Sequence, residues 1–572
     1  MFFLHRVRVK KRLLLVLTFI LLLLLFLTYH ARPSKILPIK INEHTCSVYF
    51  KELEKNSKNW SNDFFVERWW SHIPLLEKVG DDVIKHVDRL QKFHKCLNDG
   101  GLRKEDITDV QSRLFPYLDF EKLHYNEADF WPVHTRWNGE IYQQAMLKFD
   151  HQTKAFIGIE QIHHRKGQYF WDQFAQNMTQ RSSRGIVISV GNYQVGEVIR
   201  LIRVLRLLRN DLPIQIVHKG DLSEQYQEFI AKAATENHTD NFPNQELWFL
   251  NIENVLKPGY FEKFKNFGNK WLAIIFCSFD SPILLDSDTI PFTSLQRYYD
   301  YEQYERMGSV FFKDRKITND LMRSNDLDTL NKITKSLLNL DFSKSNLDET
   351  LKKLAQTNDR TALETLDNLF SNRYKHHMES GLVVLDKKRN LSSLLTAVIL
   401  HFSSINTIFH GDKEWFWFGQ FLDRQLFTFH PQDASNTGKL GNVVVEGFEG
   451  DFYQICSVQL SHTDIDDSLL WLNGGLNVCK KNSWQFDFTK NKRVADSFDS
   501  VDQVKDYYLS PIELEGTIIP DVDVRPWIRI GECAGYNYCT LYKEGEFGKF
   551  RRFTDEEKRE YNEIINIWNM PV

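Results

Sequence analysis

Apolar residues between positions 184 and 285 occur in short runs that alternate with longer segments of helical spacing. Four short runs rich in β-branched, aliphatic or aromatic residues predict buried strands: 185–191, 213–218, 247–251 and 283–285. Three segments with apolar residues three and four positions apart predict the intervening helices: 195–208, 222–234 and 269–279. Strands that alternate with helices in this way predict an α/β fold with a mostly parallel sheet and flanking helices.

The regions on either side of this α/β pattern differ from it in composition and in the spacing of apolar residues. Residues 63–180 combine helical patterns with an aromatic cluster at 130–140, which predicts a mostly helical region that packs on the α/β domain. We place that domain at 181–470 and a cysteine-containing extension at 471–572. Residues 316–375 are polar with leucines at helical spacing, which predicts a helical insertion or lid, with partial disorder as the alternative.

The amino terminus carries a basic cluster before an uncharged, largely apolar run of seventeen residues at 13–29. Seventeen helical residues span about 25 Å, enough for a thin bilayer. Since basic flanks remain in the cytosol, the pattern predicts a cytosolic tail at 1–12, a single transmembrane signal anchor at 13–29, a stem at 30–62 and a lumenal remainder. A cleaved signal peptide is the alternative, but His30-Ala-Arg-Pro33 makes a poor cleavage site.

Sequons and cysteines fit a lumenal, oxidising location. The Asn-x-Ser/Thr sequons are expected on exposed surface, at Asn59, Asn177, Asn237 and Asn390. The chain has seven cysteines, and the odd number leaves at least one of them unpaired within the chain.

The positions of the cysteines suggest which of them pair. Cys277 lies in an apolar segment and is expected to be a free, buried thiol. Proximity in the sequence favours local bridges between Cys456 and Cys479 and between Cys533 and Cys539, although spacing leaves the connectivity open.

Charge excludes one class of function. The formal net charge is −4, and the only basic cluster is the one beside the predicted membrane anchor. A nucleic-acid-binding domain needs a basic patch along one face, so no nucleic-acid partner is expected.

The most informative chemistry lies directly after the fourth predicted strand, where Asp286 and Asp288 stand one residue apart. Side chains alternate along an extended backbone, so the two carboxylates point the same way. Together they make a hard oxygen site for Mg²⁺ or Mn²⁺, especially one completed by phosphate oxygens. The same spacing recurs at 326/328, 464/466 and 521/523, but only this pair follows a buried strand. The alternative is a turn whose aspartates cap backbone N–H groups.

Seven short blocks then occur in a specific order: Gly185–Gly191, Leu212–Val217, Phe267–Ile275, Leu285–Asp288, Phe311–Arg315, Glu379–Gly381 and Gly411–Glu414. Taken together they resemble the fungal Golgi α-mannosyltransferases of glycosyltransferase family 71, which extend mannan with GDP-mannose. The resemblance covers roughly residues 184–462, about half of the chain. The Phe311–Arg315 block and the Cys533…Cys539 tail look closer to the α-1,3 branch than to its α-1,2 relatives.

The resemblance implies a GT-A-like nucleotide-binding fold with a metal-binding Asp-x-Asp. Asp288 is expected to bind Mn²⁺ or Mg²⁺ directly, and Asp286 to contact the ribose, or the metal through water. The metal neutralises the charge that develops on the GDP leaving group. His462 stands where GT-A enzymes often have a late third metal ligand, although an ordinary surface or N-cap-adjacent histidine is the alternative.

Other residues are candidates for substrate contacts. Lys313 and Arg315 are expected to bind phosphate, with Lys270 and the Arg200/Arg203 pair as alternatives.

The 411–415 segment packs two acids and a lysine between a glycine and an aromatic run. Asp412 or Glu414 is expected to receive an acceptor hydroxyl, with Trp415 or Trp417 stacking on sugar. The alternative is a solvated turn before a buried aromatic helix. His376 and His377 are weaker candidates for the acceptor side.

Together with the predicted signal anchor, the resemblance implies a type II Golgi membrane enzyme that transfers mannose from GDP-mannose to mannose-terminated N- or O-linked glycans. The family's α-linked products from an α-linked donor imply that the anomeric configuration is retained. Front-face attack is favoured because no carboxylate in the sequence can be identified as a nucleophile. Other Golgi mannosyltransferases are candidate partners. Two alternatives remain: an α-1,2-mannosyltransferase of the same family, and a catalytically silent mannan-binding subunit.

Overall fold

The computed structural model describes residues 46–65, 79–98, 101–150, 152–179, 183–236, 242–356, 358–443 and 452–572. The predicted cytosolic tail at 1–12 and signal anchor at 13–29 lie outside these ranges. Within them, no helix is both long and apolar enough to cross a membrane. Part of the predicted stem is folded: helix α2 (Cys46–Asn56) buries Tyr49 and Phe50 and is tied by a disulfide to α3 (Asp81–Asn98).

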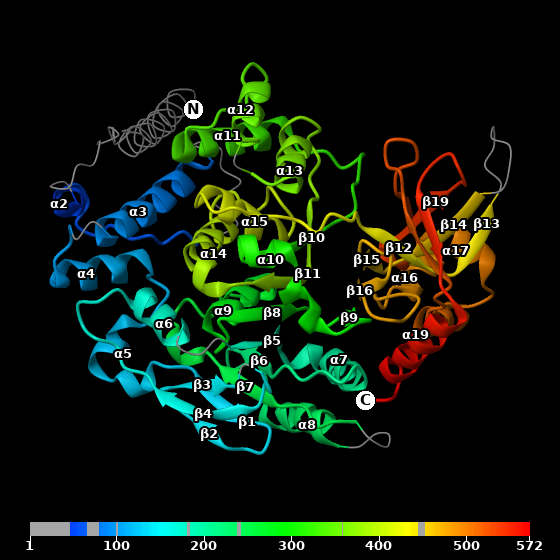
Figure 1. Cartoon of the computed structure of the whole chain (residues 1–572), viewed down its shortest axis with the longest axis horizontal. Helices are drawn as coiled ribbons and strands as arrows, with labels where there is room; N and C mark the ends of the chain where they lie inside the picture. Colours follow the sequence, from blue (N-terminus) through cyan, green and yellow to red (C-terminus); the bar gives the residue numbers. More distant parts are fainter. Residues whose placement is uncertain are drawn as a thin grey trace, which may run out of the picture.

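The centre of the molecule is an eight-stranded sheet in the order β10-β11-β8-β5-β6-β7-β1-β2 (Figure 1). Its strands are β1 (Val133–Arg136), β2 (Ile141–Tyr142), β5 (Arg184–Ser189), β6 (Ile214–His218), β7 (Leu247–Asn251), β8 (Ser281–Leu285), β10 (Ser309–Lys313) and β11 (Met378–Leu385). The four strands predicted between residues 184 and 285 are confirmed, and they form the parallel centre in the order β8-β5-β6-β7.

The remaining strands of this sheet correct the prediction of a mostly parallel arrangement. β10 and β11 on one side, and β1 and β2 on the other, are all antiparallel to their neighbours, so the sheet is mixed. An apolar run reports that a strand is buried but not in which direction the chain enters it. β1 and β2 precede residue 181, and they nevertheless belong to the same sheet as the predicted α/β domain.

Helices cover both faces of the parallel centre. Ile186 and Ile188 belong to a buried cluster with α7 (Val195–Leu207) and α8 (Glu224–Thr235), whereas Val187 belongs to the cluster that contains α9 (Asn269–Phe276). Because successive side chains of a strand point to opposite faces, one short apolar run fills two cores. The predicted helices at 195–208, 222–234 and 269–279 are thereby confirmed with small shifts of their ends.

Further helices surround this core. Between residues 63 and 180 lie α3, α4 (Lys104–Leu114), α5 (Phe120–Tyr125) and α6 (Phe170–Thr179), together with the hairpin of β3 (Ala145–Phe149) and β4 (Phe156–Gln161). The polar segment at 316–375 holds α11 (Ser324–Leu338), α12 (Leu347–Leu354) and α13 (Arg360–Phe370). The others near the sheet are α10 (Glu302–Met307), α14 (Lys387–Phe402) and α15 (Lys413–Leu422).

A C-terminal lobe, yellow to red in Figure 1 apart from the green strand β9, lies beside the sheet. Its six-stranded sheet has the order β20-β17-β12-β15-β16-β9, and a four-stranded sheet has the order β13-β14-β19-β18. The strands are β9 (Thr289–Pro291), β12 (Ser435–Gly438), β13 (Leu440–Val443), β14 (Phe452–Ser457), β15 (Leu460–Thr463), β16 (Leu469–Asn473), β17 (Gly516–Ile519), β18 (Ile528–Ile530), β19 (Asn537–Tyr542) and β20 (Lys549–Arg552). The helices are α16 (Trp484–Lys490), α17 (Lys492–Ser497), α18 (Val501–Leu509) and α19 (Asp555–Trp568).

Strand β9 joins this lobe to the Asp286–Asp288 segment. It begins at Thr289, immediately after Asp288, and pairs with β16. The boundary placed at residue 470 falls inside β16, so the cysteine-containing extension shares the sheet that begins beside the aspartates.

The disulfides differ from the local pairs favoured by the sequence. Cys456 bonds Cys539 across neighbouring strands, Cys479 bonds Cys533, and Cys46 bonds Cys96. The expected bridges Cys456–Cys479 and Cys533–Cys539 are therefore wrong, because the pairing of β14 with β19 places Cys456 opposite Cys539. Cys277 is a buried free thiol, as predicted.

The asparagines of the predicted sequons differ in how exposed they are. Asn59 is exposed, Asn177 is half-buried on α6, and Asn237 lies outside the described residues. Asn390 is buried, and its amide donates to the carbonyl of Gly308 at 3.0 Å. The prediction of an exposed acceptor asparagine is therefore wrong at position 390.

Buried histidines make the stability of the fold depend on pH. Burial lowers the pKa of His134 to about 3 and those of His218 and His377 to about 4. The unfolded chain takes up protons at these residues near pH 6.5, whereas the folded chain takes them up only near pH 4 or below. The stability that the neutral histidines contribute is therefore fully present above about pH 6.5 and is lost progressively as the pH falls toward 4.

We expect the thermal unfolding temperature to decrease by at least several degrees between pH 7.5 and pH 5, measured by scanning calorimetry. His134→Gln should show a shallower dependence, since it removes one of these protonation sites. Identical pH profiles of the two proteins would contradict the role of His134.

Candidate active site

The loop after β8 carries Asp286 and Asp288 and lies where the order of the parallel strands reverses. From β5 the chain passes to β6 on one side, and β8 pairs with the other side of β5. Ligands of open α/β sheets bind outside the carboxyl ends of the strands at such a switch point. The topology therefore provides a ligand site where the sequence predicted one.

The loop after β5 connects its neighbours at this edge of the sheet. The N–H of Asn192 donates to the carbonyl of Asp221 after β6, at 3.1 Å. The amide of Gln194 donates to the hydroxyl of Ser287, between the two aspartates, at 3.4 Å. Tyr193 stands between these contacts with 80% of its surface exposed. Three loops thus form one rim, with an aromatic ring open to solvent.

A buried lysine holds Asp286 in place. Lys270 Nζ, on α9, lies 2.7 Å from Asp286 Oδ1 and 3.2 Å from Asp412 Oδ2. Burial raises the pKa of Asp286 to about 7 against the effect of Lys270, and the charges of Asp412 and Asp288 add to the rise. Although burial opposes it, the two carboxylates raise the pKa of Lys270 above its ordinary value. Three of the predicted site residues are therefore assembled as one ion-paired group, in which Lys270 and Asp412 are buried and Asp286 is partly exposed.

Asp288 is held in position through its backbone carbonyl, and its carboxylate is partly exposed to solvent. Its carbonyl accepts the N–H groups of Gly474 at 3.0 Å and Gly475 at 2.9 Å, both in the turn after β16. Its side chain is 29% exposed, with Lys480 Nζ 4.0 Å from Oδ2. The C-terminal lobe therefore fixes the position of Asp288 and supplies a cation next to it.

Glu379 on β11 lies on the other side of this loop. Its Oε1 accepts the Asn473 amide at 2.6 Å and the N–H of Gly381 at 3.1 Å. The carbonyl of Gly381 in turn accepts the N–H of Asp286 at 2.9 Å. A Cβ at position 381 would lie 2.6 Å from the Thr289 hydroxyl, so this close approach requires glycine. Burial raises the pKa of Glu379, and the negative charge of Asp314 raises that pKa further.

The two aspartates provide the donor atoms that a divalent cation prefers, but they provide few of them. Both are carboxylates at the end of one strand, and Asp288 has no cation nearer than Lys480 in the described part of the chain. In that part, no cluster of three His, Cys, Asp or Glu side chains is arranged to hold a metal ion. A metal at Asp286 and Asp288 fits only if a bound substrate supplies further oxygen ligands.

His462 does not join the two aspartates. It is 2% exposed, and its ring stacks on Trp471 with the centroids 4.0 Å apart and meets Phe312 edge-on. Burial lowers its pKa well below the ordinary value. The expected role as third metal ligand does not hold in this arrangement, because β15 directs the side chain into the core.

Glu414 also has a structural position. It is fully buried, its Oε1 accepts the N–H of His377 at 2.9 Å, and its Oε2 accepts the Trp417 indole N–H at 2.7 Å. Trp415 and Trp417 are likewise fully buried. None of them is open to an acceptor sugar, so the alternative of a buried aromatic helix holds for α15. Asp412, at 2% exposure, positions Lys270 rather than an acceptor hydroxyl.

The predicted phosphate ligands Lys313 and Arg315 both contact residues that follow the main sheet in the sequence. Lys313 Nζ lies 2.7 Å from Asp433 and 3.4 Å from Glu364. Arg315 donates to the carbonyl of Val458 at 3.2 Å and lies over an aromatic ring of the lobe. Their cations are thus occupied by protein groups in this structure. Of the alternatives, Arg203 donates to the carbonyl of Pro571, and Lys270 binds Asp286.

Comparisons with known proteins decide the family. Residues 183–464 match the Mannosyl_trans3 mannosyltransferase family. The alpha-1,3-mannosyltransferase MNT2 of Saccharomyces cerevisiae is 46% identical over 528 residues, which cover 92% of each chain. The chain belongs to this mannosyltransferase family. The alpha-1,3-mannosyltransferase MNT3 of the same yeast is 30% identical over 92% of this chain and 83% of its own.

The solved structures add little to this mannosyltransferase assignment. The mannosyltransferase Ktr4p from S. cerevisiae in complex with GDP is 10% identical, covering 41% of this chain and 66% of its own. Its TM-score of 0.26 is too low to support a conclusion. The family predicted from the seven sequence blocks is confirmed by the sequence matches alone.

In this mannosyltransferase, two groups beside the aspartates were not predicted. Glu379 belongs to a block that supported the family, but no role was assigned to it. Lys480 follows Cys479 in a polar stretch and has no local signal. Only the pairing of β16 with β9 brings this part of the chain beside Asp288.

Proposed function

We propose that the chain is a retaining α-1,3-mannosyltransferase that uses GDP-mannose and mannose-terminated glycans. The linkage is supported by relatives named as alpha-1,3-mannosyltransferases, one of them 46% identical over 92% of both chains. The observation that carries the chemistry is the pair Asp286 and Asp288, fixed at the topological switch point of the parallel strands.

The rim of the sheet offers separate contacts for each part of the donor. The exposed ring of Tyr193 gives a flat surface on which a guanine base can stack. Lys480, 4.0 Å from Asp288, supplies a positive charge for the diphosphate. When a Mn²⁺ or Mg²⁺ is bound by Asp288 and Asp286, it supplies further charge neutralisation of the leaving diphosphate.

The reaction we propose proceeds on the face of mannose that carries the nucleotide. The acceptor hydroxyl oxygen bonds to C1 as the bond from C1 to the β-phosphate oxygen breaks. The proton of the acceptor hydroxyl passes to the departing phosphate oxygen. Because attack and departure take place on the same face of C1, the α configuration is retained. Lys270 keeps Asp286 oriented throughout, since it ties that carboxylate to Asp412.

The cellular setting is also a proposal. Residues 13–29 would anchor the enzyme as a single-pass type II protein of the Golgi membrane, with the catalytic part in the lumen and other Golgi mannosyltransferases as partners. The apolar run behind a basic cluster supports this topology.

The test of the function is mannose transfer by the full chain with GDP-mannose, Mn²⁺ and α-linked mannobiose. Digestion of the product with linkage-specific mannosidases should identify an α-1,3 bond. An α-1,2 product would overturn the linkage and keep the chemistry. No transfer by a folded protein that still binds mannan would favour the silent mannan-binding subunit.

A further inference from the structure

A carboxylate lies next to the exposed ring of Tyr193 at the rim of the sheet. It belongs to Asp221, in the loop after β6, whose side chain is 33% exposed. A Cβ added to Gly191, just after β5, would lie 3.4 Å from the Tyr193 ring and 3.7 Å from Asp221 Oδ2. An aromatic ring and a carboxylate oxygen therefore border the same small space beside Gly191.

The loop after β6 holds this carboxylate in place. Asp221 Oδ1 accepts the N–H of Lys219 at 3.0 Å, which closes a tight turn. Gly220, at the centre of the turn, has a φ of +84°, a conformation that favours glycine. The carbonyl of Asp221 accepts the N–H of Asn192 at 3.1 Å, which joins this loop to the loop after β5. The ring and the carboxylate are therefore preorganised relative to each other, and this lowers the cost of binding a ligand.

The carboxylate of Asp221 has capacity left for a ligand. In the part of the chain that the structure describes, its Oδ2 accepts no hydrogen bond, and the ammonium of Lys219 lies 3.7 Å away. That distance is longer than a hydrogen bond. Oδ1 keeps a second lone pair beside the one that the N–H of Lys219 occupies. The two oxygens can therefore accept two parallel hydrogen bonds from one planar group.

Guanine presents such a pair of donors. Its N1–H and its N2 amino group are adjacent on the Watson–Crick edge and point the same way. Uracil has a single N3–H between two carbonyl oxygens, so one carboxylate oxygen would face a carbonyl oxygen and repel it. A site built to bond two N–H groups discriminates strongly against a ligand that lacks one of them.

The same rim connects this space to the aspartate pair. Gln194 directly follows Tyr193, and its amide donates to the hydroxyl of Ser287 at 3.4 Å. Ser287 stands between Asp286 and Asp288. A base stacked on the tyrosine and a diphosphate at the aspartates can therefore belong to one bound nucleotide.

We infer that Asp221 selects guanine as the base of the sugar-nucleotide donor, by accepting hydrogen bonds from N1–H and from the N2 amino group while Tyr193 stacks on the ring. This inference rests on the proposed function, in which GDP-mannose is the donor. It assigns the choice of nucleotide to one side chain, which touches the base and not the reacting atoms.

The test measures the dissociation constants of GDP and UDP by titration calorimetry, with Mn²⁺, for the full chain and for Asp221→Asn. The amide oxygen of asparagine can still accept the N–H of Lys219, so the turn should be kept. We expect the preference of the wild type for GDP over UDP to fall about ten- to a hundredfold in the variant, as the loss of a hydrogen bond to a charged group predicts. An unchanged ratio of the two constants, at wild-type thermal stability, overturns the inference. A wild type that binds GDP no more tightly than UDP also overturns it.

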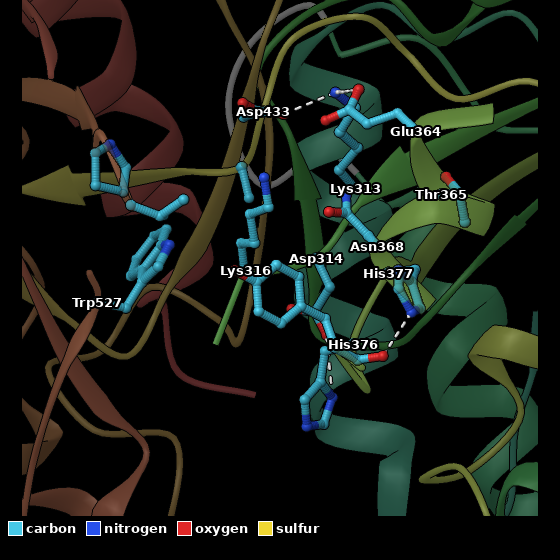
Figure 2. A pocket seen from close by; sticks show the side chains of 14 residues that line it. Lys313, Asp314, Lys316, Glu364, Thr365, Asn368, His376, His377, Asp433 and Trp527 are labelled. Atoms are coloured by element: carbon cyan, nitrogen blue, oxygen red, sulfur yellow. Dashed lines mark hydrogen bonds and ion pairs between the residues drawn. The ribbon is translucent and has the colours of Figure 1, made fainter. Parts of the chain in front are cut away.

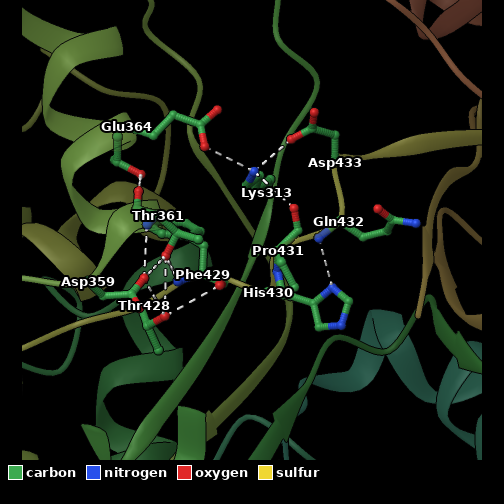
Figure 3. Close-up of polar contacts among 11 residues, drawn as sticks. Lys313, Asp359, Thr361, Glu364, Thr428, Phe429, His430, Pro431, Gln432 and Asp433 are labelled. Carbon is green, nitrogen blue, oxygen red and sulfur yellow. Dashed lines mark hydrogen bonds and ion pairs between the residues drawn. The ribbon is translucent and has the colours of Figure 1, made fainter. Parts of the chain in front are cut away.

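Asp433→Asn is the matched control, because its carboxylate also lies beside a lysine. It is 2.7 Å from Lys313 Nζ, a pair that Figure 3 shows. Figure 2 shows Asp433 among the residues around a small hollow that neither Tyr193 nor Asp221 lines. This variant should keep the wild-type ratio of the two dissociation constants.

Tyr193→Ala separates stacking from recognition of the edge of the base. It should weaken the binding of GDP and of UDP by a similar factor of about ten, since every base has a face that can stack. Unchanged GDP affinity in this variant would mean that the base binds elsewhere, and would overturn the inference. If Asp221→Asn loses the preference for GDP but the wild type transfers no mannose, the proposed function fails and the assignment of Asp221 stands. If the wild type transfers mannose and Asp221→Asn keeps the preference, the function stands and the inference fails.

Discussion

Asp288→Asn is expected to lower mannose transfer by about a hundred- to a thousandfold, the size of effect produced by removing one electrostatic contact to the leaving group. The substitution keeps the shape of the side chain and removes its charge. The carbonyl of Asp288, which accepts the N–H groups of Gly474 and Gly475, is unaffected, so the loop should keep its structure. Initial rates with GDP-mannose and mannobiose, at several Mn²⁺ concentrations, measure the loss.

The chain contains a matched control for this substitution. Asp328 belongs to another Asp-x-Asp pair, is exposed on α11, and lies in the polar insertion. Asp328→Asn should transfer mannose at the wild-type rate. If Asp288→Asn, with an unchanged unfolding temperature, also retained wild-type transfer, the assignment of the active site to this loop would be wrong.

The second large effect concerns stability. Lys270→Met leaves the carboxylates of Asp286 and Asp412 without their shared cation in a site where Lys270 is 8% and Asp412 2% exposed. Breaking a buried ion pair from one side costs about 3–5 kcal/mol, because an uncompensated charge stays out of water. The free energy of unfolding, measured by guanidinium denaturation, should fall by about that amount.

Two further variants show whether charge is the cause. Lys270→Met combined with Asp412→Asn should regain part of the lost stability, since one of the two unpaired carboxylates is then neutral. Lys332→Met breaks the ion pair with Asp81 at the surface and should cost less than about 1 kcal/mol. Failure of the double variant to regain any stability would point to lost packing instead of unpaired charge.

Local patterns predicted the parts of this protein that depend on short stretches of chain. The strands β5, β6, β7 and β8 and their helices follow from apolar spacing over five to fifteen residues, because the periods of strand and helix differ. The place of Asp286 and Asp288 follows in the same way, since a strand that ends in two acids puts both at its carboxyl end. The order of seven short blocks identified the family, which the sequence matches confirm.

Contacts between distant residues decided the rest of the site. Lys270 meets Asp412, which lies 142 positions later (412 − 270), and Lys480 reaches Asp288 only because β16 pairs with β9. The burial of Glu414 and His462 depends on which elements cover α15 and β15. The residues next to a glutamate or histidine in the sequence look the same whether its side chain is buried or exposed. Sequence reasoning therefore proposed Glu414 as a contact of the acceptor hydroxyl and His462 as a metal ligand, and packing placed both in the core.

Strand direction and cysteine pairing also depend on contacts between residues that are distant in the sequence. An apolar run indicates that β10 and β11 are buried, whereas their antiparallel direction depends on the side of the sheet from which the preceding segment enters. Cys456 meets Cys539 because β14 and β19 pair, although Cys479 is nearer in the sequence. The sequence by itself determined the central strands and helices, the place of the aspartate pair and the family. Only the tertiary structure decided which charges meet, because that depends on free energies of packing summed over the whole chain.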